Sequence, residues 1–165
     1  MSLHNCKHSF EQLALIVFPR MLTELRHVME LPVHFSDVLS IPKRIPESSG
    51  CYVVMTEGSV FYVGIAKNLR RRLRQHLLAD PSGANLAVRM AAKALSEKVS
   101  RVKKHADFEA AFSRAKEKLM QSTVAFIEIE NPLEMYIFEP YCAMAFNTGE
   151  FNYFDTLQIL NPKIK

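Results

Sequence analysis

Two short hydrophobic runs on either side of a polar turn dominate the middle of the chain. The first covers about residues 51–56 and the second about 60–64, and both are rich in β-branched and aromatic residues. Residues 57–59 (Glu-Gly-Ser) separate them. Apolar runs joined by a short glycine-containing turn are typical of an antiparallel hairpin. The alternating, β-rich segment at 123–130 predicts a third strand.

Before the hairpin, hydrophobic positions recur at helical spacing. Residues 8–30 carry one apolar stripe, and Pro19 inside it predicts a kink or two helices. Residues 31–49 contain three prolines and predict a connector that wraps on the domain.

A further helix is predicted directly after the hairpin, from about Asn68, a good N-cap residue, to Ala79. Leucines four residues apart form its apolar stripe, and Arg72 and His76 flank that stripe on one side. We therefore expect Arg72 and His76 to lie near the sheet. The remaining arginines of the helix should face solvent or a ligand; they are Arg70, Arg71 and Arg74.

Three more helices are expected towards the C-terminus. Periodicity predicts one over about 84–103 and one over 108–121, the latter capped by Asp107. Asn131 followed by Pro132 predicts another helix start, and Pro140 should bend or tighten that helix.

These elements predict an α+β fold, a small three-stranded antiparallel sheet flanked by helices. We expect residues 1–47 to form an N-terminal helical extension packed on the domain, because they are too few to bury a core alone. Residues 48–165 should form the domain itself, with a helical insertion at about 80–122.

Composition fits one ordinary domain: 165 residues, 48% of them hydrophobic. The three cysteines form no CxxC pair, which predicts buried free thiols in a reducing cytoplasm. No apolar run approaches the ~20 residues that span a bilayer. Polar residues also interrupt any signal-peptide pattern at the N-terminus, so we expect a cytoplasmic protein without membrane contact.

The net charge of +4 is unevenly distributed. Residues 67–104 hold 11 lysines and arginines against two acidic residues, a net charge of +9, while the remainder has a net charge of −5. A run of charge is often only a solvated helical face. Its position beside the hairpin favours a polyanionic partner instead.

The hairpin and the helix after it carry the candidate chemistry. Residues 50–52 read Gly-Cys-Tyr and residues 62–64 read Tyr-Val-Gly; Arg72 follows eight residues after the second triplet, and His76 four later. Two tyrosines in a hairpin are usually packing residues. Together with arginines and a histidine, however, phenols suit phosphodiester chemistry. This segment resembles the GIY-YIG nuclease family, which includes the nuclease domain of the excinuclease C subunit and homing and restriction endonucleases.

The resemblance implies a metal-binding glutamate on a later helix, and four glutamates between 128 and 139 are candidates. Leu133 to Ile137, with a downstream asparagine at Asn147, resembles the family's glutamate helix, so we select Glu134 as the metal ligand and Asn147 as a residue that fixes the site. Asn131 to Glu134 is equally a capping-box pattern, in which Glu134 closes on its own N-cap. Glu139 is the second choice; the other candidates are Glu128 and Glu130.

By resemblance, the function is endonucleolytic hydrolysis of DNA with Mg²⁺ or Mn²⁺. Tyr52 first, and Tyr62 second, would take a proton from the attacking water, with His76 helping or accepting that proton. Arg72 would stabilise charge in the transition state.

The remaining cations of this region are candidates for phosphate contacts, with a solvated face as the alternative. They are Lys67, Arg70, Arg71 and Arg74. Several family members carry a lysine directly after the second triplet, where this chain has Ile65. A catalytically inactive nucleic-acid-binding or adaptor module of the same fold therefore stays open. The resemblance does not specify the DNA substrate, such as a repair intermediate, or the oligomeric state.

Overall fold

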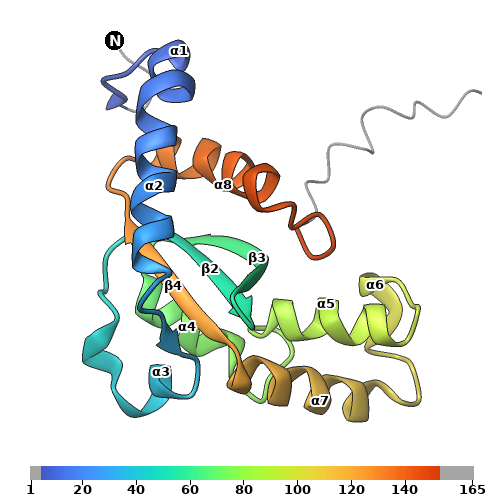
Figure 1. Ribbon diagram of the computed structural model, residues 1–165. Coiled ribbons are helices and arrows are strands. Elements are labelled where there is room, and N and C mark those ends of the chain that lie inside the picture. The colour runs from blue at the N-terminus through green and yellow to red at the C-terminus, as the bar shows by residue number, and fades with distance from the viewer. Residues whose placement is uncertain (1–4, 153–165) are drawn as a thin grey trace, which may run out of the picture.

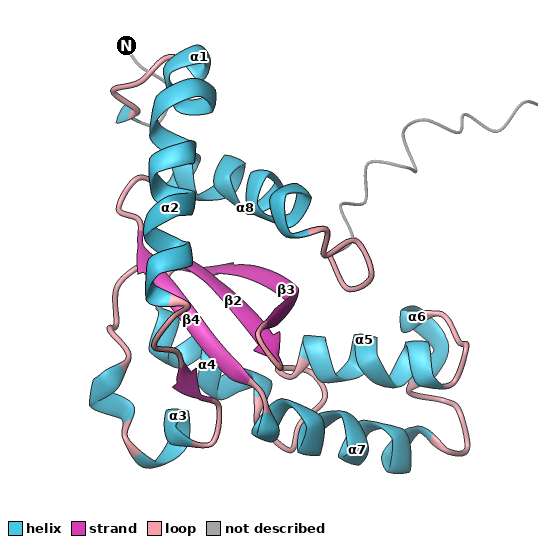
Figure 2. Ribbon diagram, viewed as in Figure 1, coloured by secondary structure: helices cyan, strands magenta, loops and turns pink. Residues whose placement is uncertain are grey.

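A four-stranded antiparallel sheet forms the centre of the computed structural model, which describes residues 5–152 (Figures 1 and 2). The strand order is β1-β4-β2-β3. The strands are β1 (Val33–His34), β2 (Gly50–Thr56), β3 (Ser59–Ala66) and β4 (Thr123–Glu128).

The predicted α+β fold is confirmed, but the prediction of three strands is wrong by one. The connector after α2 places Val33 and His34 beside Val124 and Thr123, and so adds β1 at the edge. Two residues are too few to show the alternation by which a strand is found in a sequence.

The predicted hairpin of β2 and β3 is present, and it closes through a turn of two residues, since Ser59 already belongs to β3. Thr56 pairs with Ser59, and the two residues between them, Glu57 and Gly58, have φ angles of 53° and 76°. Positive φ at both central positions gives the turn the twist of the strands that it joins. The register shifts after Val54, so the strands form a bulge near the turn.

Helices and single helical turns make up most of the rest. They are α1 (Phe10–Gln12), the π-helical η2 (Leu13–Val17), α2 (Phe18–Val28), α3 (Asp37–Ser40), the 3₁₀ turn η3 (Pro42–Arg44), α4 (Leu69–His76), α5 (Asn85–Ala94), α6 (Val99–Val102), α7 (Phe108–Gln121) and α8 (Pro132–Phe146). Within residues 5–152, none of them combines the length and the apolar character needed to cross a membrane.

The kink expected at Pro19 takes the form of a π-helical turn. Residues 10–28 are helical throughout, and η2 immediately precedes the first turn of α2, which contains Pro19. Proline has no N–H to donate to the carbonyl four residues earlier, and a π turn accommodates such an interruption.

Two details of the predicted insertion are wrong. The helix expected over 84–103 is two helices, α5 and α6, because the chain turns at Ser96, whose φ is 51°. Asp107 precedes α7 as predicted, but its side chain makes no capping hydrogen bond. Its backbone has φ −93° and ψ 12°, and not the extended conformation of a usual N-cap. Helices α5 and α7 lie side by side (Figure 1).

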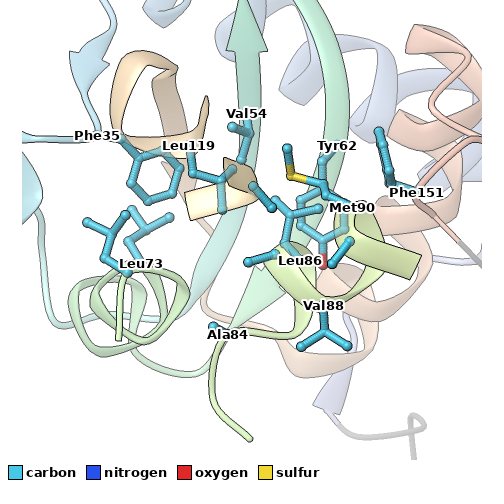
Figure 3. Close-up of a cluster of buried hydrophobic side chains, with 14 of the residues drawn as sticks. Phe35, Val54, Tyr62, Leu73, Ala84, Leu86, Val88, Met90, Leu119 and Phe151 are labelled. Carbon is cyan, nitrogen blue, oxygen red and sulfur yellow. The ribbon is translucent and has the colours of Figure 1, made fainter. Parts of the chain in front are cut away.

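Alternation along the strands gives the sheet two different buried faces. On one face, Tyr52, Val54 and Tyr62 pack with residues of α4, α5 and α7. On the other face, Cys51 and Val53 pack with residues of α2 and α8. Figure 3 shows the first face, where the side chain of Tyr62 lies beside Leu86 and Met90 of α5. The candidate chemistry therefore lies on the face that α4, α5 and α7 cover.

Candidate active site

Helix α4 presents the two predicted side chains to the sheet. The Asn68 side chain caps the helix by accepting the Arg71 N–H at 2.8 Å. Leu69 and Leu73 are completely buried, and His76, on the same side of the helix, is also completely buried. The predicted direction of this helix face is thus confirmed.

Two phenols and one imidazole form a ring cluster on this face of the sheet. The Tyr52 hydroxyl and His76 Nε2 are hydrogen-bonded at 2.6 Å. The Tyr62 ring centroid lies 6.1 Å from that of Tyr52 and 6.0 Å from that of His76. Residues from two strands and one helix are therefore fixed against one another.

The glycines of the two triplets permit this close packing. A Cβ at Gly64 would lie 2.5 Å from the Tyr52 hydroxyl oxygen, because the Tyr52 ring lies across this glycine from the neighbouring strand. A Cβ at Gly50 would lie 2.1 Å from the carbonyl oxygen of Ile127 on β4. Each triplet thus contributes a phenol and a backbone position where no side chain fits.

Arg72 lies beside both phenols and is half-buried. Burial by itself would lower the pKa of the Arg72 guanidinium, but interactions with the Tyr52 and Tyr62 oxygens outweigh it and raise the pKa. One guanidinium nitrogen also donates to the Gly83 carbonyl at 3.3 Å. The cation is thus held between the ring cluster and the loop after α4.

Burial determines the protonation states of Tyr52 and His76, which are hydrogen-bonded to each other. It raises the pKa of Tyr52 well above the usual value, with the Tyr62 phenol adding to the effect and Arg72 opposing it. Burial, together with the charges of Arg72 and Arg89, lowers the pKa of His76 to about 3. At neutral pH Tyr52 is therefore a neutral phenol and His76 a neutral imidazole. His76 Nδ1 is buried with no hydrogen-bond partner among the described residues.

The depressed pKa of His76 predicts a loss of stability in mild acid. Below about pH 6.5 the unfolded chain protonates this imidazole, whereas the folded protein does not until about pH 3. The free energy of unfolding should therefore fall as the pH drops through this window. We expect the melting temperature to fall more steeply from pH 7 to pH 5 in the wild type than in His76→Gln. Parallel melting curves for the two proteins would contradict the assignment of a neutral, buried His76.

Of the glutamates considered, Glu139 is the one on which Arg72 acts. Burial raises the pKa of the half-buried Glu139 carboxyl, while Arg89 and Arg72 act in the opposite direction. Glu128 instead accepts a hydrogen bond from the Ser48 hydroxyl. Glu130 is exposed at the start of the turn that leads to α8.

Glu134, the glutamate selected from the sequence, has different partners. Its Oε1 lies 2.9 Å from His8 Nδ1 and 3.5 Å from Cys6 Sγ, both in the N-terminal segment. Its backbone N–H donates to the Asn131 side chain, so the predicted N-cap of α8 is present. Five residues separate Glu134 from Glu139, which is about 140° around a helix. The two carboxylates therefore point to different sides of α8.

Asn147 lies in the turn at the end of α8 and is not part of the ring cluster. It ends α8 in the left-handed conformation, with φ 54° and ψ 47°, and it is exposed. Asparagine is among the residues that tolerate this conformation best. A different asparagine, Asn152, is buried against the sheet.

Asn152 fastens the C-terminal end of the described chain to β3. Its side-chain oxygen accepts the Val63 N–H at 2.9 Å, and its amide donates to the Val63 carbonyl at 2.7 Å. Since β3 is an edge strand, this amide replaces the backbone of a missing neighbouring strand. Asn152 thereby fixes the backbone beside Tyr62. Its role was not predicted from the sequence, where the available signal was an asparagine directly after the hydrophobic Phe151.

Arg89 of α5 is a second residue that the sequence analysis counted only as part of a charge run. Its charge lowers the pKa of His76 and acts on Glu139, and it donates to the Phe151 carbonyl at 2.6 Å. It lies three residues after the buried Leu86, which places it on the inward side of α5. That spacing was visible in the sequence.

The four predicted phosphate-binding residues differ in exposure. The Arg70 side chain is anchored to the connector, where it donates to the Ile45 carbonyl at 2.8 Å and pairs with Glu47. Lys67, Arg71 and Arg74 are exposed. A surface hollow of about 390 Å³ is lined in part by the arginines at 70, 71 and 74. It lies on the side of α4 that faces away from the ring cluster.

Comparison with known proteins identifies the family. The GIY-YIG catalytic domain matches residues 48–131, half of the chain, which include the hairpin, α4 and β4. The match ends before α8 and so does not distinguish Glu134 from Glu139. No curated protein matches the chain significantly.

Solved structures similar to the chain come from the GIY-YIG N-terminal endonuclease domain of UvrC from Thermotoga maritima. Its magnesium-bound form is 21% identical, with a TM-score of 0.41, and the match covers 71% of this chain and 97% of that one. Two point mutants of the same domain, bound to the divalent cation, are 22% and 18% identical, with TM-scores of 0.40 and 0.42. The match covers 72% and 71% of this chain, respectively, and 97% of each mutant. The profile match over the two triplets and α4 shows that this chain belongs to the GIY-YIG catalytic domain family.

Proposed function

We propose that the protein is an endonuclease that hydrolyses DNA phosphodiester bonds and depends on Mg²⁺ or Mn²⁺. The observation that carries this proposal is the convergence of Tyr52, Tyr62, His76 and Arg72 on one face of the sheet, with Glu139 within electrostatic reach of Arg72. A phenol pair beside a fixed guanidinium provides proton transfer and charge stabilisation in one place.

Glu139 replaces Glu134 as our candidate metal ligand. It is a half-buried carboxylate whose pKa burial raises, so a nearby positive charge would stabilise its ionised form. One carboxylate with water in the remaining positions is a usual ligand set for Mg²⁺. A divalent ion bound there would polarise a phosphate oxygen and stabilise the leaving oxygen.

Within the ring cluster we assign proton transfer from water to Tyr62 ahead of Tyr52, with Tyr62 acting as a phenolate that has already released its own proton to solvent. Tyr52 is 0% exposed and its hydroxyl is engaged with His76, whereas Tyr62 is 7% exposed. Tyr52 and the neutral His76 would hold the cluster in place through their 2.6 Å hydrogen bond. Arg72, whose raised pKa keeps it charged at neutral pH, would stabilise the negative charge on the phosphate.

The DNA backbone would contact the exposed cations Lys67, Arg71 and Arg74, since phosphate contacts position a nuclease without reading sequence. Arg70 would contribute less, because it is anchored to the connector.

We further propose that residues 48–165 form the nuclease domain, with 1–47 as an extension and 80–122 as an insertion. The three cysteines are free thiols, in accord with our proposal of a cytoplasmic protein. DNA repair is one process in which the proposed endonuclease would act.

A second candidate function is nucleic-acid binding without cleavage. The complete burial of Tyr52 and the packing of α5 over Tyr62 favour it, because neither phenol is openly accessible to substrate. Ile65 at the position after the second triplet favours it as well.

A plasmid-nicking assay tests the proposed function against this alternative. Purified protein should nick or linearise supercoiled DNA with Mg²⁺ or Mn²⁺ and leave it intact in EDTA. Binding should be measured on the same DNA by electrophoretic mobility shift. Firm binding with no cleavage on duplex, single-stranded and branched DNA would establish the adaptor function and exclude the nuclease.

A further inference from the structure

A second group of metal-ligating side chains lies at the N-terminal end of the chain. Cys6, His8 and Glu134 bring one ligand atom each to within 4.8 Å of the other two. His8 Nδ1 and Cys6 Sγ lie 2.9 Å and 3.5 Å from the same Glu134 carboxylate oxygen. Two of the residues are close in sequence, and the third comes from the first turn of α8.

We propose that these three residues form a Zn²⁺ site. A thiolate, an imidazole and a carboxylate together match the ligand preference of zinc, whereas Mg²⁺ prefers oxygen ligands alone. In a tetrahedral zinc site with bonds of about 2.0–2.3 Å, neighbouring ligand atoms are about 3.3–3.8 Å apart. The two separations from the Glu134 oxygen, 2.9 Å and 3.5 Å, lie close to this range, and all three ligand atoms lie within 4.8 Å of one another. Adjustment of the exposed His8 side chain would bring the three ligand atoms to the spacing that the ion needs.

Local structure already orients all three ligands. The Cys6 thiol donates to the His8 carbonyl at 3.5 Å, and a capping box between Ser9 and Gln12 begins α1 directly after this segment. Cys6 is 6% exposed, packed within the core cluster on the α8 side of the sheet. The Glu134 backbone is held by the Asn131 cap.

A cavity beside the cluster leaves room for a fourth ligand. Its volume is about 570 Å³, and His8, Glu134, Glu128 and Glu130 are among the residues that line it. Three protein ligands with water in the fourth position complete the coordination of zinc. The lining holds four glutamates against the two basic residues Lys7 and Arg20, and this excess of negative charge would favour a cation near the site.

This site is separate from the proposed catalytic metal. Glu134 and Glu139 point to different sides of α8, the first towards His8 and the second towards Arg72 and Arg89. Cys6 also packs in the core on the α2 and α8 face of the sheet, opposite the phenols Tyr52 and Tyr62. The zinc would fasten the segment before α1 to the start of α8, two parts of the chain 126 residues apart. Because this role is structural, zinc binding and DNA cleavage can each be present without the other.

Zinc content and cobalt spectroscopy test the proposal on the full chain. Protein loaded with Zn²⁺ and desalted should retain one zinc per chain, and Co²⁺ substitution should give a thiolate-to-cobalt charge-transfer band. Zinc should also raise the melting temperature. Cys6→Ser, His8→Ala and Glu134→Gln should each weaken zinc binding by about 100-fold or more, since even outer-shell changes cost about 10–100-fold.

The controls separate this site from adventitious zinc and from the catalytic metal. His27 and Glu30 form another histidine–glutamate pair, exposed and 3.6 Å apart, with no cysteine beside them. His27→Ala should retain zinc, and so should Glu139→Gln. Because His8 is exposed, His8→Ala should fold, and circular dichroism checks this. Absence of stoichiometric zinc in the wild type, or equal zinc retention in His8→Ala and His27→Ala, would overturn the proposal.

Discussion

Replacing Arg72 with alanine is expected to abolish DNA cleavage while leaving most of the DNA affinity. The guanidinium lies beside both phenols and is held by the Gly83 carbonyl, so it provides a fixed positive charge in the ring cluster. Removing one preorganised donor from a site of this kind typically costs at least about 100-fold in rate. Single-turnover cleavage at saturating DNA measures this loss.

Arg71 on the same helix provides the matched control. It is exposed and lines the surface hollow on the far side of α4, so Arg71→Ala should weaken DNA binding and lower the salt dependence of the affinity by about one unit of slope. Its cleavage rate at saturating DNA should stay near that of the wild type. If the two variants lost rate and affinity equally, α4 would be only an electrostatic patch and Arg72 would have no special role.

Local patterns predicted the part of the molecule between Gly50 and His76 well. The hairpin, the Asn68 cap and the inward side of α4 follow from alternation, a glycine turn and helical periodicity, all of which act within a few residues. The packing of Tyr52 across Gly64 does not follow from such patterns, because it depends on which residues the two strands bring face to face. The triplets therefore pointed to the candidate site without showing its geometry.

Features that depend on contacts distant in sequence were missed or misassigned. The edge strand β1 exists because two residues of the connector reach β4, about 90 positions later. Asn152 and Arg89 gain their places through hydrogen bonds to Val63 and Phe151. Their local signals, helical spacing from Leu86 for Arg89 and a place after Phe151 for Asn152, are shared by many ordinary surface and turn residues.

The choice between Glu134 and Glu139 likewise depends on contacts between residues distant in the sequence. Both glutamates lie on α8, and the capping pattern at Asn131 made Glu134 the more prominent in the sequence. Only the position of α8 on the sheet decides which carboxylate comes near Arg72. The helix directs Glu139 towards Arg72 and Arg89, and Glu134 towards His8.

Glu139→Gln is therefore expected to abolish metal-dependent cleavage, whereas Glu134→Gln should retain it. Glutamine preserves the size of the side chain but removes the negative charge that a hard divalent cation requires. Since burial already opposes ionisation of Glu139, the neutral amide should not lower the melting temperature appreciably. Cleavage rates across a Mn²⁺ titration, melting temperature and DNA affinity should be measured for both variants.

Full cleavage by Glu139→Gln together with loss in Glu134→Gln would return the metal role to Glu134 and place the catalytic ion near His8. Loss in both variants with intact folding would mean that both ends of α8 contribute to activity, and the zinc content of each variant would then show whether Glu134 acts through the Cys6–His8 segment.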